Sequence, residues 1–142
     1  MTETHAPERN WAGTYTYRAE KLHRPTTMEQ VQEIVARAAS VHVLGSRHSF
    51  NDIADSTELL SHENLPADVV VDHEAHTVSC GGGVKYGELA KTLNDEDVQG
   101  HTLASLPHIS VAGAVATATH GSGGYHQARP QGQETGFVRG SL

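Results

Sequence analysis

The segment from Gly45 to Ser49 holds the residues best suited to chemistry in this sequence. Gly45 lets backbone approach a ligand closely, and the hydroxyl groups of Ser46 and Ser49, with the neighbouring amides, can hold an anion. Arg47 adds a fixed positive charge. His48 lies among them, although an isolated loop histidine usually only hydrogen-bonds to its surroundings. The segment therefore predicts a ligand-facing loop that favours anions.

Two elements must position this loop. Val41–Leu44 is mostly apolar and partly β-branched, which predicts a buried strand that ends where the loop begins. Ligands bind outside the carboxyl ends of strands in open α/β sheets, so the loop stands in a suitable place. A helix precedes the strand, starting at a capping box formed by Thr26 with Glu29 or by Thr27 with Gln30 and ending near Ala39. Its apolar stripe faces a sheet and consists of Val31, Ile34, Val35 and Ala38.

The sequence patterns in the rest of the first hundred residues predict further short strands and one helix. Thr14–Tyr17 has the β-formers of a strand, and 53–66 is irregular, with Leu59, Leu60 and Leu65 directed to the core. Val69–Val71 and His76–Cys80 form a hairpin. Gly81–Gly83 then opens a helix, and we interpret these glycines as a tight turn without a ligand. The buried face of that helix consists of Tyr86, Leu89, Ala90 and Leu93.

A second informative stretch, 104–124, contains no Asp, Glu, Lys or Arg. It is too polar and too rich in glycine to span a membrane, so it must be buried against something. Its small side chains would let the backbone approach a large flat ligand. Free N–H groups at the start of a helix could then bind a diphosphate. A tightly packed alanine-rich core helix explains the stretch equally well, and these residues alone favour neither interpretation.

Composition limits the other possibilities. The net charge of −7 argues against nucleic acid or an anionic membrane as the general partner. Cys80 is the only cysteine, and 1–10 has no apolar signal-peptide core, so we expect a cytoplasmic protein. Eleven histidines suggest a metal site, but His73 and His76 flank a turn and lack partner ligands, so we expect no metal. The sequence contains no G-x-S-x-G motif, so it gives no support for a serine hydrolase.

The loop itself resembles a known family. The sequence from Gly45 to Asp52 resembles the phosphate-binding loop of flavoproteins of the vanillyl-alcohol oxidase type. It is most similar to the alditol and xylitol oxidase branch and to the sugar-lactone oxidases. In that family the matching histidine is bonded covalently to the flavin 8α-methyl group, which implies the same role for His48. The resemblance also implies that Ser46, Arg47 and Ser49 hold the diphosphate region of FAD.

The second stretch carries the same resemblance. Ser105–Gly113 and Ala116–Gly123 are similar to the second flavin-contacting segment of these oxidases and follow the first motif after about sixty residues. By matching position, Ser105 would lie near the isoalloxazine ring and the substrate. The residues implied to contact flavin are Ser110, Gly113, Thr117, Ala118, Thr119 and His120.

These observations predict an α+β FAD-binding domain of the vanillyl-alcohol oxidase (PCMH) type, with its first lobe and the start of the second. We expect a flexible tail over 1–10, the amino-terminal part of the domain over 11–124, and an irregular tail over 125–142 with no substrate domain. The resemblance implies oxidation of a CH–OH group of a polyol or sugar lactone, with dioxygen as acceptor and hydrogen peroxide as product. Polyol and lactone, and oxidase and dehydrogenase, stay open. The alternative is a truncated, non-catalytic FAD-binding remnant.

Overall fold

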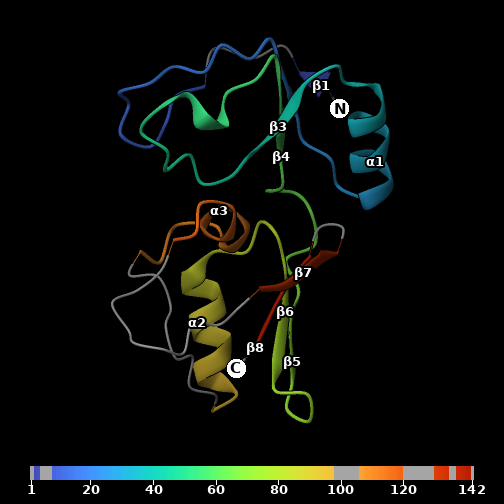
Figure 1. Ribbon diagram of the computed structural model, residues 1–142, viewed down its shortest axis with the longest axis vertical. Helices are drawn as coiled ribbons and strands as arrows, with labels where there is room; N and C mark the ends of the chain where they lie inside the picture. Colours follow the sequence, from blue (N-terminus) through green and yellow to red (C-terminus); the bar gives the residue numbers. More distant parts are fainter. Residues whose placement is uncertain (1, 4–7, 98–105, 120–129, 135–136, 142) are drawn as a thin grey trace. The chain divides into compact units, whose positions relative to one another are not determined.

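The computed structural model describes residues 2–3, 8–97, 106–119, 130–134 and 137–141, with backbone alone described for 2–3 and beyond 129. The chain divides into two compact units (Figure 1). Unit 1 comprises Met1–Pro66 and unit 2 comprises Ala67–Leu142. Each unit is described by itself below.

Unit 1 is built on a four-stranded sheet with the order β1-β2-β4-β3. The central strand β4 runs parallel to both β2 and β3, while β1 is antiparallel to β2. Parallel neighbours require crossover connections, which α1 and the loop containing the 3₁₀ helix η1 supply. The elements are β1 (Thr2–Glu3), β2 (Lys21–His23), α1 (Met28–Arg37), β3 (Val41–Leu44), η1 (Asp52–Ala54) and β4 (Glu58–Ser61).

The core of unit 1 joins one residue from each parallel strand, Leu22, Leu44 and Leu59, to the buried ring of Tyr17. Strand β3 has the predicted bounds but is not the predicted buried strand. It forms the edge of the sheet, and only Leu44 among its residues is buried. Val43 is 51% exposed, because an edge strand lacks a neighbour on one side. The carboxyl end of β3, where the loop begins, is therefore the end fixed in the core.

Helix α1 has Thr27 as its N-cap, as the second predicted capping box requires, but the return bond of that box goes to the preceding residue, Thr26. The Thr27 hydroxyl accepts from Gln30 N (3.3 Å), and the Gln30 side chain accepts from Thr26 N (2.8 Å). In the predicted apolar stripe Val31, Ile34 and Ala38 are half-buried, whereas Val35 is 55% exposed, and no residue of α1 is buried. A cavity of about 380 Å³, lined by Lys21 and His23 among others, separates the helix from the sheet, because charged and polar side chains occupy this sheet face.

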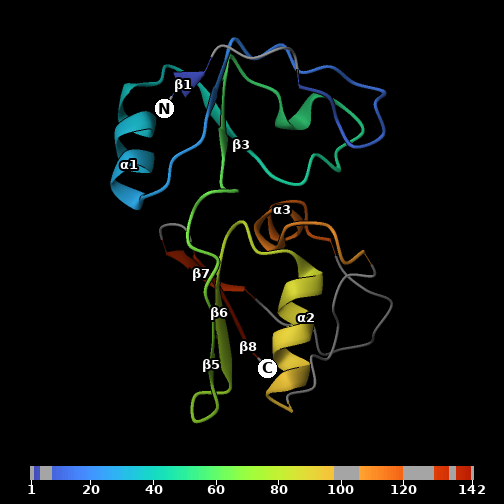
Figure 2. The ribbon, with the colours of Figure 1, turned by 180° about the vertical axis from the view of Figure 1, so that it is seen from behind.

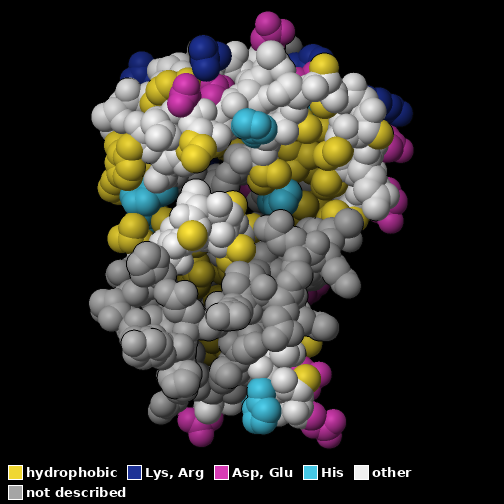
Figure 3. Space-filling model, in the orientation of Figure 1, with side chains coloured by type: hydrophobic (Ala, Val, Ile, Leu, Met, Phe, Trp, Pro, Cys, Tyr) yellow, Lys and Arg dark blue, Asp and Glu magenta, His cyan; other side chains and the backbone are white. Residues whose placement is uncertain are grey.

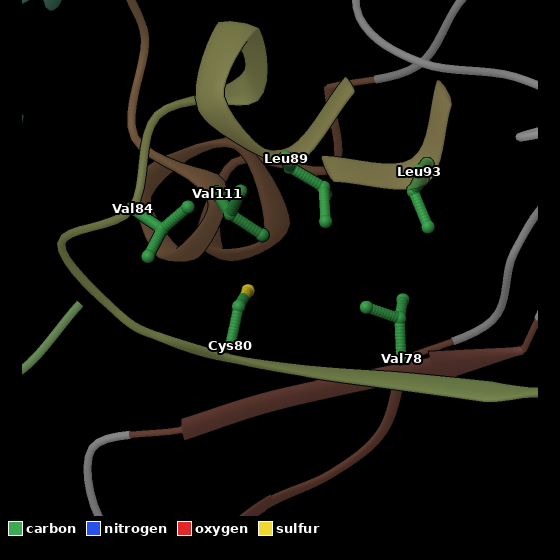
Figure 4. Packing of buried hydrophobic residues seen from close by; sticks show 6 residues of the cluster. All are labelled: Val78, Cys80, Val84, Leu89, Leu93 and Val111. Carbon is green, nitrogen blue, oxygen red and sulfur yellow. The ribbon is translucent and has the colours of Figure 1, made fainter. Parts of the chain in front are cut away.

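Unit 2 is an antiparallel sheet, ordered β5-β6-β8-β7, with α2 along one face (Figures 1 and 2). Strand β6 directs Val78 and Cys80 towards Leu89 and Leu93 of α2, which with Val84 and Val111 form the core (Figure 4). The predicted hairpin and helix are confirmed. The elements are β5 (Val69–Asp72), β6 (Thr77–Gly81), α2 (Tyr86–Asp95), α3 (Val111–Ala116), β7 (Pro130–Glu134) and β8 (Phe137–Ser141).

Several expectations about elements were wrong. The segment 125–142, predicted to be irregular, contains β7 and β8, and β8 pairs with β6 over 77–81. Strand β8 pairs with the distant β6 and β7 pairs with β8, and in this polar segment no alternation of apolar residues marks either strand. The tail 1–10 contributes β1 and a buried Asn10 (4% exposed). The expected strand Thr14–Tyr17 is reduced to one bridge, between Arg9 and Thr16.

Candidate functional site

The predicted loop extends from the carboxyl end of β3 in unit 1. Gly45 is exposed, and the four residues Ser46, Arg47, His48 and Ser49 are half-buried. The buried side chain of Leu44 fixes the start of the loop in the core. The loop is therefore held at its base and keeps part of each polar side chain accessible.

The segment just before Thr14 holds the loop from the other side. Trp11 N donates to the carbonyl oxygen of Arg47 (2.8 Å), and Asn10 Nδ2 donates to the carbonyl oxygen of Ser49 (3.0 Å). The carbonyl groups of Arg47 and Ser49, the two neighbours of His48 in the sequence, are thus bonded to two consecutive residues. Sequence reasoning missed Asn10 and Trp11, because their contacts span more than thirty-five positions along the chain.

Arg47 differs from the expectation of a freely available positive charge. Its guanidinium pairs with Glu8 Oε2 at 3.1 Å, so a carboxylate already offsets that charge. Its backbone has φ 60°, in the left-handed region that residues with a Cβ rarely adopt. Its Nε is buried and has no hydrogen-bond partner among the described residues. That donor could serve a ligand acceptor.

Two aromatic rings flank the imidazole of His48. The Trp11 ring lies edge-on at 4.8 Å between centroids, with an interplanar angle of 73°. Phe50 lies at 5.3 Å and 62°. Trp11 and Phe50 are themselves 62% and 64% exposed, and Figure 3 shows exposed hydrophobic side chains on unit 1. The two rings therefore restrain the His48 imidazole from two sides, within an apolar surface.

The buried carboxylate of Asp55 holds the amino-terminal segment at a second place, between Tyr15 and Arg18. Asp55 accepts from Tyr15 Oη (2.7 Å), from Arg18 N and Nε (3.1 Å each) and from Ser56 N (2.9 Å). Burial alone would raise the pKa of the Asp55 carboxyl, but these hydrogen bonds outweigh burial and hold its pKa below the ordinary value. The segment before β2 is therefore bonded to the segment that follows η1.

The second predicted segment lies in unit 2 and is bonded to the start of α2. Tyr86 N donates to Ile109 O (3.0 Å), Gly87 N donates to Pro107 O (2.8 Å), and Val111 N donates to the carbonyl of the residue before Lys85 (2.8 Å). The first amides of α2 are therefore occupied within the protein. This geometry agrees with the interpretation of Gly81–Gly83 as a turn without a ligand.

Helix α3 contains or borders the remaining predicted contacts. Ser110 is its buried N-cap, and a Cβ on Gly113 would lie 2.8 Å from the Ser110 hydroxyl, which would have to move. At the other end Thr119 N donates to Ala114 O and Ala118 N to Val115 O, a Schellman ending with Ala118 at φ 52°.

The described part of 104–124 therefore contains a short helix with Val111 and Ala114 buried, which both of the two interpretations allow. Ser105 and His120 lie outside the described residues. The structure brings Gly45–Ser49 together within unit 1 and Ser110–Thr119 together within unit 2. Among the described residues, no group of three His, Cys, Asp or Glu side chains could hold a metal ion, and no helix has the length and apolar character that crossing a membrane requires.

Comparison with known proteins decides the family. The family model described as "FAD binding domain" matches residues 19–136. The chain belongs to this family. It is 51% identical over 118 residues to the alditol oxidase of a Streptomyces species, covering 80% of this chain and 28% of that protein. It is 31% identical over 129 residues to the D-arabinono-1,4-lactone oxidase of Yarrowia lipolytica, covering 83% and 24%. The chain thus spans about a quarter of these relatives.

Solved structures identify the fold. The cholesterol oxidase of B. sterolicum superposes with a TM-score of 0.70 at 18% identity, covering 87% of this chain and 24% of that one. Aclacinomycin oxidoreductase gives 0.65 at 18%, covering 80% and 24%. The predicted α+β FAD-binding fold of the PCMH type and the resemblance to alditol and aldonolactone oxidases are confirmed.

The residues present fit an FAD cofactor. Gly45 adds no side chain at the loop entrance, and the buried Arg47 Nε offers a donor that no described residue uses. The aromatic rings around His48 provide an apolar surface of the kind that a flavin ring packs against. The pairing of Arg47 with Glu8 means that a bound diphosphate would share that guanidinium with a carboxylate.

Proposed function

We propose that this chain is the FAD-binding part of an oxidoreductase that oxidises a CH–OH group of a polyol or a sugar lactone. The flavin accepts hydride in such reactions, and dioxygen then takes the electrons to give hydrogen peroxide. The 51% identity to an alditol oxidase supports a polyol, and the lactone oxidase supports a lactone. A relative in Mycobacterium tuberculosis is an L-gulono-1,4-lactone dehydrogenase, 31% identical over 119 residues, so the electron acceptor is part of the proposal.

His48 is the proposed point of covalent attachment. The observation that carries this proposal is a histidine restrained on both sides, by its flanking carbonyls and by the rings of Trp11 and Phe50. Attachment would join a ring nitrogen of His48 to the flavin 8α carbon with loss of one hydrogen from each. Dioxygen would accept these two hydrogens as hydrogen peroxide, so atoms and electrons would balance.

The other predicted residues keep proposed roles. Ser46 and Ser49 would offer hydroxyl groups to the diphosphate, and Arg47 would offer its guanidinium, weakened by Glu8. The proposed flavin contacts in the second segment are Ser110, Gly113, Thr117, Ala118, Thr119 and His120, with Ser105 near the substrate. We also propose a cytoplasmic location, which the single cysteine supports.

Acid precipitation after incubation with FAD tests the attachment. Yellow colour should stay in the pellet of the wild-type chain and be lost in His48→Ala, while circular dichroism stays unchanged. His42→Ala is the matched control, because His42 is an exposed histidine on the preceding strand β3. Acid-stable flavin in His48→Ala would show that another residue is the attachment point.

A non-catalytic FAD-binding chain is the second candidate. It rests on the FAD-binding family of the chain alone, without the activity of its relatives. A flavin spectrum that no polyol or lactone bleaches under anaerobic conditions is its expected signature. Bleaching by one of these substrates would favour the first candidate instead.

A further inference from the structure

Asn10 has every polar group of its side chain and backbone engaged. Its backbone N donates to Tyr15 O (3.0 Å), and its carbonyl accepts from Gly13 N (2.9 Å). Its side-chain Oδ1 accepts from Tyr15 N (3.0 Å), and Nδ2 donates to Thr14 Oγ1 and to Ser49 O (3.0 Å each). Because Tyr15 N can only donate, the side-chain amide has one possible orientation. Nδ2 must therefore face Ser49.

This arrangement ties a compact turn over 10–15 to the loop that carries His48. Asn10 Nδ2 holds the carbonyl of Ser49, the residue after His48, and Trp11 N holds the carbonyl of Arg47, the residue before it. Trp11 also contacts the His48 ring directly. A displacement of the turn would therefore change both the backbone at His48 and the surface beside its ring.

We propose that the side-chain amide of Asn10 is a positioning group that sets the orientation of the His48 imidazole for flavin attachment. The proposal rests on the proposed role of His48. Asn10 itself touches no reacting atom. It acts through the Ser49 carbonyl, and together with Trp11 it restrains the backbone of the loop on both sides of His48. Preorganisation of this kind governs rates, since misplacing a reacting group by about 1 Å can cost roughly a hundredfold.

Asn10→Asp isolates the single contact that matters. The new side chain has the same shape, can still accept from Tyr15 N, and can accept from the Thr14 hydroxyl, which rotates to donate. The bond to Ser49 O is replaced by a repulsion, because an oxygen of the new, negatively charged carboxylate would face a carbonyl oxygen. Protonation would restore a donor, so the defect should diminish as the pH falls.

Thr14→Val is the matched control. It removes the other acceptor of Asn10 Nδ2 while keeping the shape of an exposed side chain. The loop carrying His48 keeps its bond to Asn10. Attachment in Thr14→Val should therefore proceed at the wild-type rate.

The experiment follows acid-stable flavin over time in the wild-type chain, Asn10→Asp and Thr14→Val, and records the NMR signals of the His48 ring without flavin. We expect attachment in Asn10→Asp to be slower by about tenfold to a hundredfold at neutral pH. The ratio to wild type should recover in acid, and the His48 signals should shift in this variant alone.

Wild-type attachment rates and unshifted His48 signals in folded Asn10→Asp would overturn the inference and leave the proposed function standing. A defect that is the same at every pH would also overturn it, because general loss of structure explains that result. If the wild-type chain attaches no flavin, the proposed attachment is wrong. The His48 signals in the two variants then decide by themselves whether Asn10 orients the ring.

Discussion

Arg47 combines two opposing contributions at one residue. Its φ of 60° costs about 1–2 kcal/mol for a residue with a Cβ, while its ion pair with Glu8 is partly buried and stabilising. Arg47→Ala and Arg47→Gly both remove the ion pair, but only glycine relieves the backbone. We expect Arg47→Gly to be more stable than Arg47→Ala by about 1 kcal/mol in urea unfolding. Equal stabilities would mean that the loop leaves this conformation in solution.

Ala118 offers a second test of the same backbone conformation, now at the end of α3. It occupies the left-handed position of the Schellman ending at φ 52°, where glycine is preferred. Ala118→Gly should therefore raise the free energy of unfolding by about 0.5–1 kcal/mol. Ala116→Gly, in the last helical position, should lower it by about 0.5–1 kcal/mol. The same sign of change in both variants would contradict the helix ending.

At the scale of elements, Gly87 allows α2 and the segment 107–111 to pack closely. A Cβ there would lie 3.1 Å from both the Cβ and the carbonyl oxygen of Pro107. Because the hydrogen bond from Gly87 N holds that carbonyl, the segment cannot easily move away. We expect Gly87→Ala to lower the free energy of unfolding by about 1 kcal/mol despite its better helix propensity. Thermal melts of both variants measure this, with Asn94→Ala as the control. Because Asn94 is an exposed position of α2, that variant should be as stable as the wild type or more stable.

Asp55 makes the stability of unit 1 depend on pH. Its pKa is lowered in the folded state, so the unfolded chain takes up the proton first as the pH falls. Stability from this carboxylate is present above about pH 4 and is lost as the pH falls through the folded pKa. Asp55→Asn should lower the free energy of unfolding by about 2 kcal/mol at pH 7 and weaken its dependence on acid pH.

Asp52→Asn is the control for this experiment. Asp52 lies three positions earlier, in η1, and is exposed. Denaturant unfolding between pH 3 and 7 compares the two variants with wild type. An acid dependence in Asp55→Asn equal to that of wild type would assign the effect to other carboxyl groups.

The sequence was informative where the signal is local. Helices α1 and α2 were predicted because apolar residues recur at helical spacing, and Thr27 marks the start of α1 through its own hydroxyl. Strands β2 and β4 were missed because Lys21–His23 is short and Glu58–Ser61 does not alternate. Each becomes a strand through pairing with a neighbour more than thirty residues away in the sequence.

The same distinction holds for the site. The motif around His48 could be recognised from its residues, whereas the hydrogen bonds from Asn10 and Trp11 could not, since no local pattern joins residues so far apart. Sequence reasoning also treated Arg47 as a free charge. Its partner Glu8 belongs to the segment that was expected to be a mobile tail.

At the scale of the whole molecule, charge sets how an anionic cofactor approaches. The chain has a net charge of −7, and the diphosphate of FAD is also negative, so their long-range interaction is repulsive. Salt screens charges more than about 10 Å apart at 0.1 M while leaving contacts within the site less affected. If the chain binds FAD as proposed, raising the salt from about 0.01 M to 0.1 M should increase the association rate by roughly threefold. Stopped-flow measurement of flavin fluorescence provides this rate, and uncharged riboflavin is the control, expected to show no change. A rate for FAD that falls with salt would mean that local positive charge, with Arg47 the first candidate, outweighs the net charge during the approach.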